Sequence, residues 1–207
     1  NEFSLGIWCS IGHPDVSEIM GTVGFDWVGF DAEHGPLDTL TLQTLMQAMH
    51  SSKSIPFIRV PWNDAVMIKQ ALDIGAYGLI IPMVNTKEEA VRVVRAMKYP
   101  PEGVRGFGPR RALLQDENYA STANDELLII IQIETQQALD NLDEILSVKG
   151  VDVAAIGPSD LSLSMGIHEQ WEHPRLKKAM DDVIDACKRH NVTPGMLYVG
   201  DDSYLEN

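Results

Sequence analysis

The chain has 207 residues, of which 44% are hydrophobic and 22% are charged, which suffices for one well-packed domain and barely for two. We therefore expect a single domain over residues 1–207. The formal net charge of −14 and the pI of about 4.7 argue against nucleic acid or an anionic membrane as a partner, because the long-range field would repel both. A small molecule is the expected ligand.

We expect a cytoplasmic protein, because the sequence shows no targeting signal and only two distant cysteines. No apolar run approaches the roughly 18 residues of a membrane span, and the N-terminus lacks the basic, apolar and small-residue pattern of a signal peptide. Cys9 and Cys187 lie far apart, and no Cys or His stands at metal-finger spacing. We expect both cysteines to be reduced, structural thiols.

Short apolar runs alternate along the chain with longer segments of helical period. The expected strands are Leu5–Ser10, Trp27–Asp31, Pro56–Val60, Gly78–Val84, Leu127–Glu134, Val151–Gly157 and Thr193–Val199. Each internal gap has roughly the length of a crossover helix with its loops. This alternation is typical of an α/β protein with a parallel sheet.

Helix signals fill these gaps. Asn63 or Asp64 can cap a helix that ends at Gly75. Thr86 and Glu89 have the spacing of a capping box for the next helix. Further helices are expected over 135–146 and 174–190, whereas 100–124 is long and weakly patterned.

The seven expected strands leave the topology open. A (β/α)8 barrel typically needs about 250 residues and eight strands to close without an edge. The chain ends at Asn207, shortly after the seventh run. Periodicity alone allows an open doubly wound sheet, or a barrel whose last strand and helix are absent from this sequence.

Polar side chains follow several expected strands at their carboxyl ends, where parallel α/β folds bind ligands. They are Asp31, Glu33 and His34 for the second strand, Arg59 for the third, Met83 for the fourth, Gln132 and Glu134 for the fifth, and Ser159 and Asp160 for the sixth. Several strands therefore direct ionisable groups to one rim, the edge of the sheet formed by the carboxyl ends of the strands.

Each of these residues also has a purely structural interpretation. Glu134 and Asp160 could favour the dipoles of the helices that follow them. Arg59 could form a structural ion pair inside its apolar strand, and His34 could bond to backbone in a turn. Because one rim collects two acids, an arginine and a histidine, the joint pattern favours a functional site.

This set of side chains suits metal-assisted chemistry on a 2-oxo acid. Two carboxylates, completed by water and a chelating substrate, suit Mg²⁺ or Mn²⁺, whereas catalytic zinc usually has more histidine. A metal chelated by the carboxylate and ketone of a 2-oxo acid would stabilise the enolate formed when a C–C bond breaks. A guanidinium could share that charge and a histidine could move the proton.

Other chemistries are disfavoured. All lysines fall in expected helices or loops and none at a strand exit, which argues against a Schiff-base mechanism. No GxGxxG or GxxxxGK[ST] pattern follows a strand. We interpret "RGFGPRR" as a substrate or interface loop, whose Arg105, Arg110 and Arg111 could equally form a solvated or subunit-contact patch.

The chain resembles the HpcH/HpaI aldolase family, the metal-dependent class II pyruvate aldolases with a phosphoenolpyruvate/pyruvate-type (β/α)8 TIM barrel. The motifs that carry the resemblance are "GFDWVGFDAEHGP", "PFIRVPWND", "IKQALDIGAYGLIIPMV", "KYPPEGVRGFG", "IIQIET" and "GVDVAAIGPSDLSLSMG". They occur in the family's order along most of the chain. The resemblance therefore covers the whole expected fold and not one motif.

The resemblance implies roles for the residues at the rim. Glu134 and Asp160 would ligate the metal, which would be Mg²⁺ or Mn²⁺, with Co²⁺ as a further candidate. Arg59 would hold the pyruvyl oxygen, and His34 would serve as the acid/base. Asp73, in "ALDIG", would orient His34.

The resemblance also implies how the substrate binds. Backbone amides around Ser159 and Asp160 would hold the pyruvate carboxylate, and we place Gln132 among the substrate-binding residues. Asp31 and Glu33 become supports of the site, because the metal ligands are better supplied by the fifth and sixth strands.

Family members usually continue for a further strand and helix, and that helix typically packs on a neighbouring subunit. We therefore expect the sequence to be incomplete at its C-terminus, with the eighth strand and last helix missing. The same argument predicts a homo-oligomer, a trimer or a hexamer.

The expected function is reversible cleavage of a 4-hydroxy-2-oxo acid into pyruvate and an aldehyde by a divalent-metal aldolase, a carbon–carbon lyase. One alternative is a metal-dependent lyase acting on a malyl- or citramalyl-CoA-type thioester. A third is a metabolite-binding barrel without turnover. The residues do not specify the aldehyde.

Overall fold

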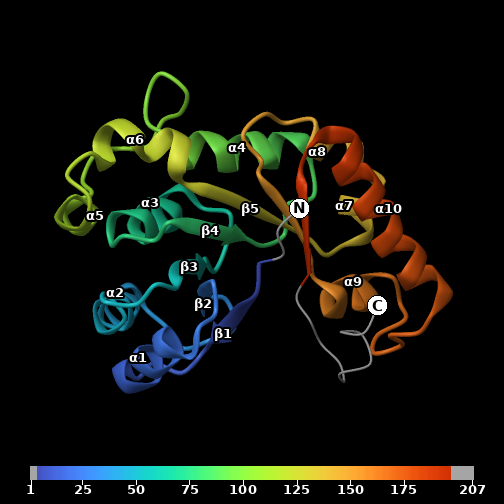
Figure 1. Ribbon diagram of the computed structural model, residues 1–207. Helices are drawn as coiled ribbons and strands as arrows, with labels where there is room; N and C mark the ends of the chain where they lie inside the picture. The colour runs from blue at the N-terminus through green and yellow to red at the C-terminus, as the bar shows by residue number, and fades with distance from the viewer. Residues whose placement is uncertain (1–3, 197–207) are drawn as a thin grey trace. The chain divides into compact units, whose positions relative to one another are not determined.

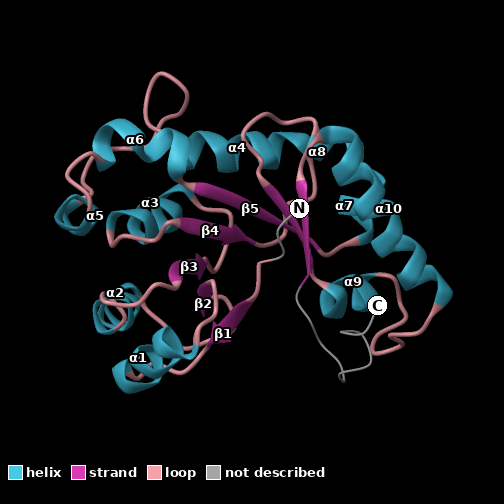
Figure 2. Ribbon diagram, viewed as in Figure 1, coloured by secondary structure: helices cyan, strands magenta, loops and turns pink. Residues whose placement is uncertain are grey.

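The computed structural model of the chain describes residues 4–196. Its strands are β1 (Gly6–Cys9), β2 (Trp27–Asp31), β3 (Ile55–Arg59), β4 (Gly78–Ile81), β5 (Leu128–Ile133), β6 (Val153–Ile156) and β7 (Thr193–Met196). Its helices are α1 (Pro14–Val23), α2 (Thr39–Ala48), α3 (Ala65–Asp73), α4 (Lys87–Met97), α5 (Arg110–Gln115), α6 (Tyr119–Glu126), α7 (Gln136–Asp140), α8 (Leu142–Leu146), α9 (Pro158–Ser164) and α10 (Pro174–His190) (Figure 1). Strands and helices alternate along most of the chain (Figure 2).

The strands form a sheet in which the spatial order follows the chain from β1 to β7. Every neighbouring pair whose register the structure gives runs parallel. The expected parallel α/β architecture is therefore confirmed.

The described residues group into two compact units. The first comprises residues 4–82 and 92–129, and the second comprises 83–91 and 130–196. In the first unit β2–β4 bury almost every side chain, as strands of a parallel sheet covered by helices do. In the second unit α10 packs on α8 and β7, and residues 130–133 of β5 are buried. The expected single domain stays a prediction.

Two predicted helix caps are confirmed. The carboxylate of Asp64 accepts hydrogen bonds from the backbone N–H groups of Val66 and Met67 at the start of α3. Before α4, the Thr86 hydroxyl accepts from the backbone N–H of Glu89, while the Glu89 carboxylate accepts from that of Thr86. These reciprocal contacts make the capping box.

The structure differs from the sequence pattern in two segments. The helix expected over 135–146 is divided into α7 and α8 at Asn141, whose side chain donates to the backbone oxygen of Asn85. The weakly patterned segment 100–124 contains α5 and α6. The predicted strands corresponding to β1, β4, β5 and β6 are two or three residues longer than the observed ones, and the third is shifted by one residue. Residues 197–199 of the seventh lie outside the described residues.

Cys9 and Cys187 are free and buried, as expected of structural thiols. Burial raises the pKa of both thiols, that of Cys187 to about 11, so both stay protonated and unreactive near neutral pH. None of the helices in the described part of the chain is long and apolar enough to cross a membrane.

The Asp64 cap yields a prediction for stability. Asp64→Ala should lower the free energy of unfolding by about 1 kcal/mol, because two N–H groups at the start of α3 lose their acceptor. Asp64→Asn keeps an acceptor oxygen and is the matched control. Urea denaturation followed by circular dichroism measures both, and equal stabilities of the two variants would contradict the capping role.

Candidate functional site

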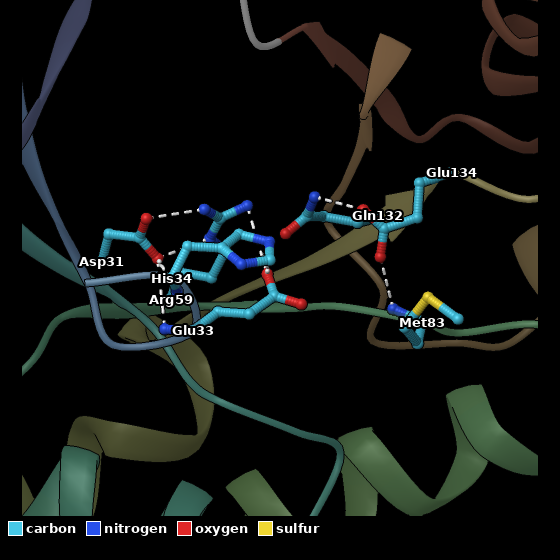
Figure 3. Close-up of polar contacts among 7 residues, drawn as sticks. All are labelled: Asp31, Glu33, His34, Arg59, Met83, Gln132 and Glu134. Carbon is cyan, nitrogen blue, oxygen red and sulfur yellow. Dashed lines mark hydrogen bonds and ion pairs between the residues drawn. The ribbon is translucent and has the colours of Figure 1, made fainter. Parts of the chain in front are cut away.

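A buried ion pair joins the ends of β2 and β3 in the first unit (Figure 3). The parallel register places Asp31 opposite Arg59. The guanidinium donates from Nε to Oδ1 of Asp31 over 2.8 Å and from Nη2 to Oδ2 over 2.7 Å. Such a bidentate contact fixes both the position and the plane of the guanidinium.

Further contacts complete the surroundings of Arg59. Nη1 lies 3.2 Å from Oε2 of Glu33, and Cζ lies 4.8 Å from the centroid of the Trp8 ring, in cation–π contact. Asp31 and Glu33 thus both contact Arg59, so their expected supporting role has a physical basis. Sequence reasoning missed Trp8, because β1 gives no signal of what its aromatic ring faces.

Asp31 also shapes the turn that carries His34. Its Oδ1 accepts hydrogen bonds from the backbone N–H groups of Glu33 and His34. The His34 side chain is 65% exposed, with Nε2 3.8 Å from Oε2 of Glu33. The imidazole therefore stands at the end of β2 with access to solvent, and its acid/base role stays a prediction.

The Asp31 carboxylate is held in its charged form. Burial acts to raise its pKa, but the hydrogen bonds and charge of Arg59, together with the backbone N–H groups of Glu33 and His34, outweigh burial and lower the pKa. The ion pair is therefore intact throughout the neutral range.

A second cluster surrounds Glu134 in the second unit, where β5 ends (Figure 3). Glu134 is 2% exposed. Its Oε1 accepts from the backbone N–H of Met83 over 2.6 Å, and its Oε2 accepts from Nε2 of Gln132 over 2.7 Å. Each carboxylate oxygen thus has a donor that fixes its direction.

The surroundings of Glu134 fit an oxygen-coordinated cation. Oε1 of Gln132 is buried with no hydrogen-bond partner in the described part of the chain. At Gly157 a Cβ would lie 2.9 Å from Oε2 of Glu134 and 3.3 Å from Nε2 of Gln132, so a larger residue there would displace the Glu134 side chain. A buried, oriented carboxylate is a ligand that suits a hard divalent ion.

Asp160 lies in the first turn of α9, directly after β6. Since β5 and β6 pair with Ile133 opposite Ile156, Glu134 and Asp160 follow neighbouring strand ends. Within residues 4–196, no group of three or more His, Cys, Asp or Glu side chains could hold a metal ion.

Asp73 contacts an arginine from the segment after α4. Its Oδ1 accepts from Nη2 of the fully buried Arg105 over 2.8 Å. Asp73 is the last residue of α3, which connects β3 to β4. A helix that connects two parallel strands runs antiparallel to them. Asp73 therefore lies toward the amino end of β4. His34 follows the carboxyl end of β2. The orienting role of Asp73 stays a prediction from the resemblance.

Arg105 and Arg111, from the loop interpreted as a substrate or interface loop, are structural in the first unit. Arg105 donates to the hydroxyl of Tyr119 and lies over the Tyr99 ring. Arg111 donates to backbone oxygens that end α2 and α3. Neither role could be deduced from spacing, because the partners are distant in sequence.

A parallel α/β fold whose strand ends carry carboxylates, an arginine and an exposed imidazole has the features of an α/β enzyme. The family model described as HpcH/HpaI aldolase/citrate lyase matches residues 4–204, and the chain belongs to this family. The resemblance stated from the motifs is thereby confirmed.

Known relatives and structures agree with this assignment. A 4-hydroxy-2-oxo-heptane-1,7-dioate aldolase of Klebsiella pneumoniae subsp. pneumoniae is 41% identical over 98% of this chain and 79% of that protein. A 5-keto-4-deoxy-D-glucarate aldolase of Citrobacter koseri is 40% identical over 93% and 76%. The crystal structure of a family protein from Burkholderia cenocepacia matches with a TM-score of 0.92 and 32% identity, over 98% of this chain and 82% of that one. The expected class, a carbon–carbon lyase of the aldolase type, is confirmed.

The Asp31–Arg59 pair predicts how stability depends on pH. Asp31→Asn should lower the free energy of unfolding near pH 7 by about 3 kcal/mol, because it leaves a buried guanidinium without its main counter-charge. The folded-state pKa of Asp31 is lowered, so this stabilisation is present above the unfolded pKa of about 3.9 and is lost as the pH falls through the folded pKa.

Urea unfolding of the wild type and the variant between pH 2.5 and 7 measures the difference. It should stay constant above about pH 5 and shrink below about pH 4. Asp181→Asn, at an exposed position on α10, is the control. A difference that does not change with pH would contradict the charge pairing.

Proposed function

We propose that the chain cleaves a 4-hydroxy-2-oxo acid reversibly into pyruvate and an aldehyde, with the help of a divalent cation. The observation that carries the proposal is the buried Glu134 carboxylate, whose two oxygens are oriented by the N–H of Met83 and the amide of Gln132. A carboxylate set in this way offers a cation a ligand that needs no rearrangement. The aldolase names of the two relatives support the reaction.

Glu134 and Asp160 would hold the cation, with Mg²⁺ or Mn²⁺ expected and Co²⁺ as a third candidate. When bound, the ion would polarise the 2-oxo group and share the negative charge that develops on cleavage. Gln132, Ser159 and the backbone around Asp160 are the proposed contacts of the pyruvyl part.

Arg59 and His34 have the remaining roles in this proposal. His34 takes the proton of the C4 hydroxyl, the C3–C4 bond breaks, and the aldehyde leaves. The electron pair of that bond passes into the pyruvate enolate, whose oxygen Arg59 stabilises by a charged hydrogen bond. Protonation at C3 then gives pyruvate. Asp31 and Glu33 hold the guanidinium in place beforehand, which reduces the reorganisation that the step requires.

The finer structural expectations belong to this proposal. A (β/α)8 barrel is consistent with parallel strands that follow the chain order from β1 to β7. A homo-oligomer and a cytoplasmic location remain proposed. The buried, free state of Cys9 and Cys187 agrees with a reducing compartment.

Removal of either proposed metal ligand should abolish turnover. Glu134→Ala and Asp160→Ala are each expected to slow pyruvate release by at least about 100-fold, and a chelator should do the same to the wild type. Pyruvate release is followed with lactate dehydrogenase and NADH, and circular dichroism checks the fold. Asp181→Asn is the surface control. Normal turnover in either alanine variant, or full activity after chelation, would exclude this mechanism.

The class of substrate can be tested separately. We expect cleavage of free 4-hydroxy-2-oxo acids and none of malyl- or citramalyl-CoA, because a net charge of −14 disfavours the polyanionic CoA group. Both classes are assayed with Mg²⁺, Mn²⁺ and Co²⁺, by pyruvate release and by release of the CoA thioester product. Faster turnover of the thioester would replace this proposal with a CoA-dependent lyase.

A further inference from the structure

Met83 has a backbone conformation that is unusual for its residue type. Its φ is 56°, in the left-handed region, where residues with a Cβ are disfavoured. Asn191 shares this φ, but it ends α10, where asparagine is well tolerated. Met83 instead follows β4, and its N–H donates to Glu134. The strained residue is therefore also the one that contacts the buried carboxylate.

The segment that contains Met83 is fixed by hydrogen bonds on both sides. The Asn85 side chain donates from Nδ2 to the backbone oxygen of Met83 over 3.0 Å, and its Oδ1 accepts from the hydroxyl of Thr135, the residue after Glu134. The Asn141 side chain donates to the backbone oxygen of Asn85 over 2.8 Å. Together these contacts hold the backbone in a conformation that Met83 alone would not prefer.

The other side of Glu134 is fixed as well. Gln132 is 1% exposed and donates to Oε2, while Gly157 leaves just enough space for both side chains. A carboxylate with a fixed donor on each oxygen cannot rotate about its last bond without losing a hydrogen bond. The carboxylate therefore keeps a set direction.

We propose that Met83 is a positioning residue for the metal site: its left-handed backbone aims the N–H at Oε1 of Glu134 and so sets the carboxylate for a divalent cation. The proposal rests on the metal-dependent function above and deepens it. In this proposal the backbone conformation of Met83 positions the carboxylate, and the thioether side chain has no role.

The proposal predicts a pattern among substitutions at this position. Met83→Leu and Met83→Ile introduce side chains of equal volume, but only isoleucine is β-branched and strongly disfavoured at positive φ. Met83→Ile should weaken Mn²⁺ binding by about 10-fold or more, the scale expected when a metal ligand loses its orienting partner. Met83→Leu, Met83→Gly and Met83→Asn should bind within about 2-fold of the wild type, because they tolerate the conformation as well as methionine or better.

An amide-to-ester replacement at Met83 isolates the N–H. Incorporation of the α-hydroxy analogue of methionine removes only this donor, so Mn²⁺ binding should again weaken by about 10-fold. Free Mn²⁺ is measured by electron paramagnetic resonance, which needs no turnover, and thermal unfolding reports whether each variant is folded.

The outcomes separate this inference from the proposed function. Wild-type Mn²⁺ affinity in both the isoleucine and the ester variants would overturn the role of Met83 alone. Equal loss of affinity in Met83→Leu and Met83→Ile would also overturn it, since the backbone would then not decide binding. Failure of the wild type to bind Mn²⁺ would overturn the inference and the metal-dependent proposal together. Binding of Mn²⁺ without pyruvate release would remove only the proposed reaction.

Discussion

Parallel pairing of neighbouring strands determines where the candidate site residues lie. Because β2 and β3 pair with Asp31 opposite Arg59, an acid and a base separated by 28 residues meet at a distance that allows two hydrogen bonds. The same rule sets Glu134 and Gly157 side by side after Ile133 and Ile156. A shift of either pair by one residue would turn these side chains to the opposite face of the sheet.

The two clusters stabilise buried charge in different ways. In the first unit the guanidinium of Arg59 contacts two carboxylates, so the charges are compensated by side chains of the chain itself. In the second unit a backbone N–H and a neutral amide donate to Glu134 and orient its carboxylate. The proposed mechanism assigns the cation to Glu134 because a carboxylate is a ligand for a hard cation, and the anionic substrate oxygen to Arg59 because a guanidinium binds anions.

Sequence periodicity predicted the features that depend on neighbours along the chain. β2 has the predicted bounds, α10 has the predicted length, and Asp64 caps α3, because burial pattern, capping and turn chemistry are local. The ion pair of Arg105 with Asp73 could not be predicted in the same way. Its partners are 32 residues apart and meet only once α3 and the segment after α4 have packed. The motif "ALDIG" singled out Asp73 as a residue of interest, but it did not predict the contact with Arg105.

Two departures from local rules in the second unit, the divided helix and the left-handed Met83, belong to one hydrogen-bonded network. The predicted helix over 135–146 is divided at Asn141, and the side chain of Asn141 donates to the backbone of Asn85. Asn85 in turn holds the backbone oxygen of Met83, the residue with the unfavourable φ. A left-handed conformation costs about 1–2 kcal/mol for a residue with a Cβ, and an interrupted helix loses hydrogen bonds of its own. The left-handed residue donates to the Glu134 carboxylate, and the interrupted helix reaches it only through Asn85, so this network supports the direction of that carboxylate at a cost in local stability.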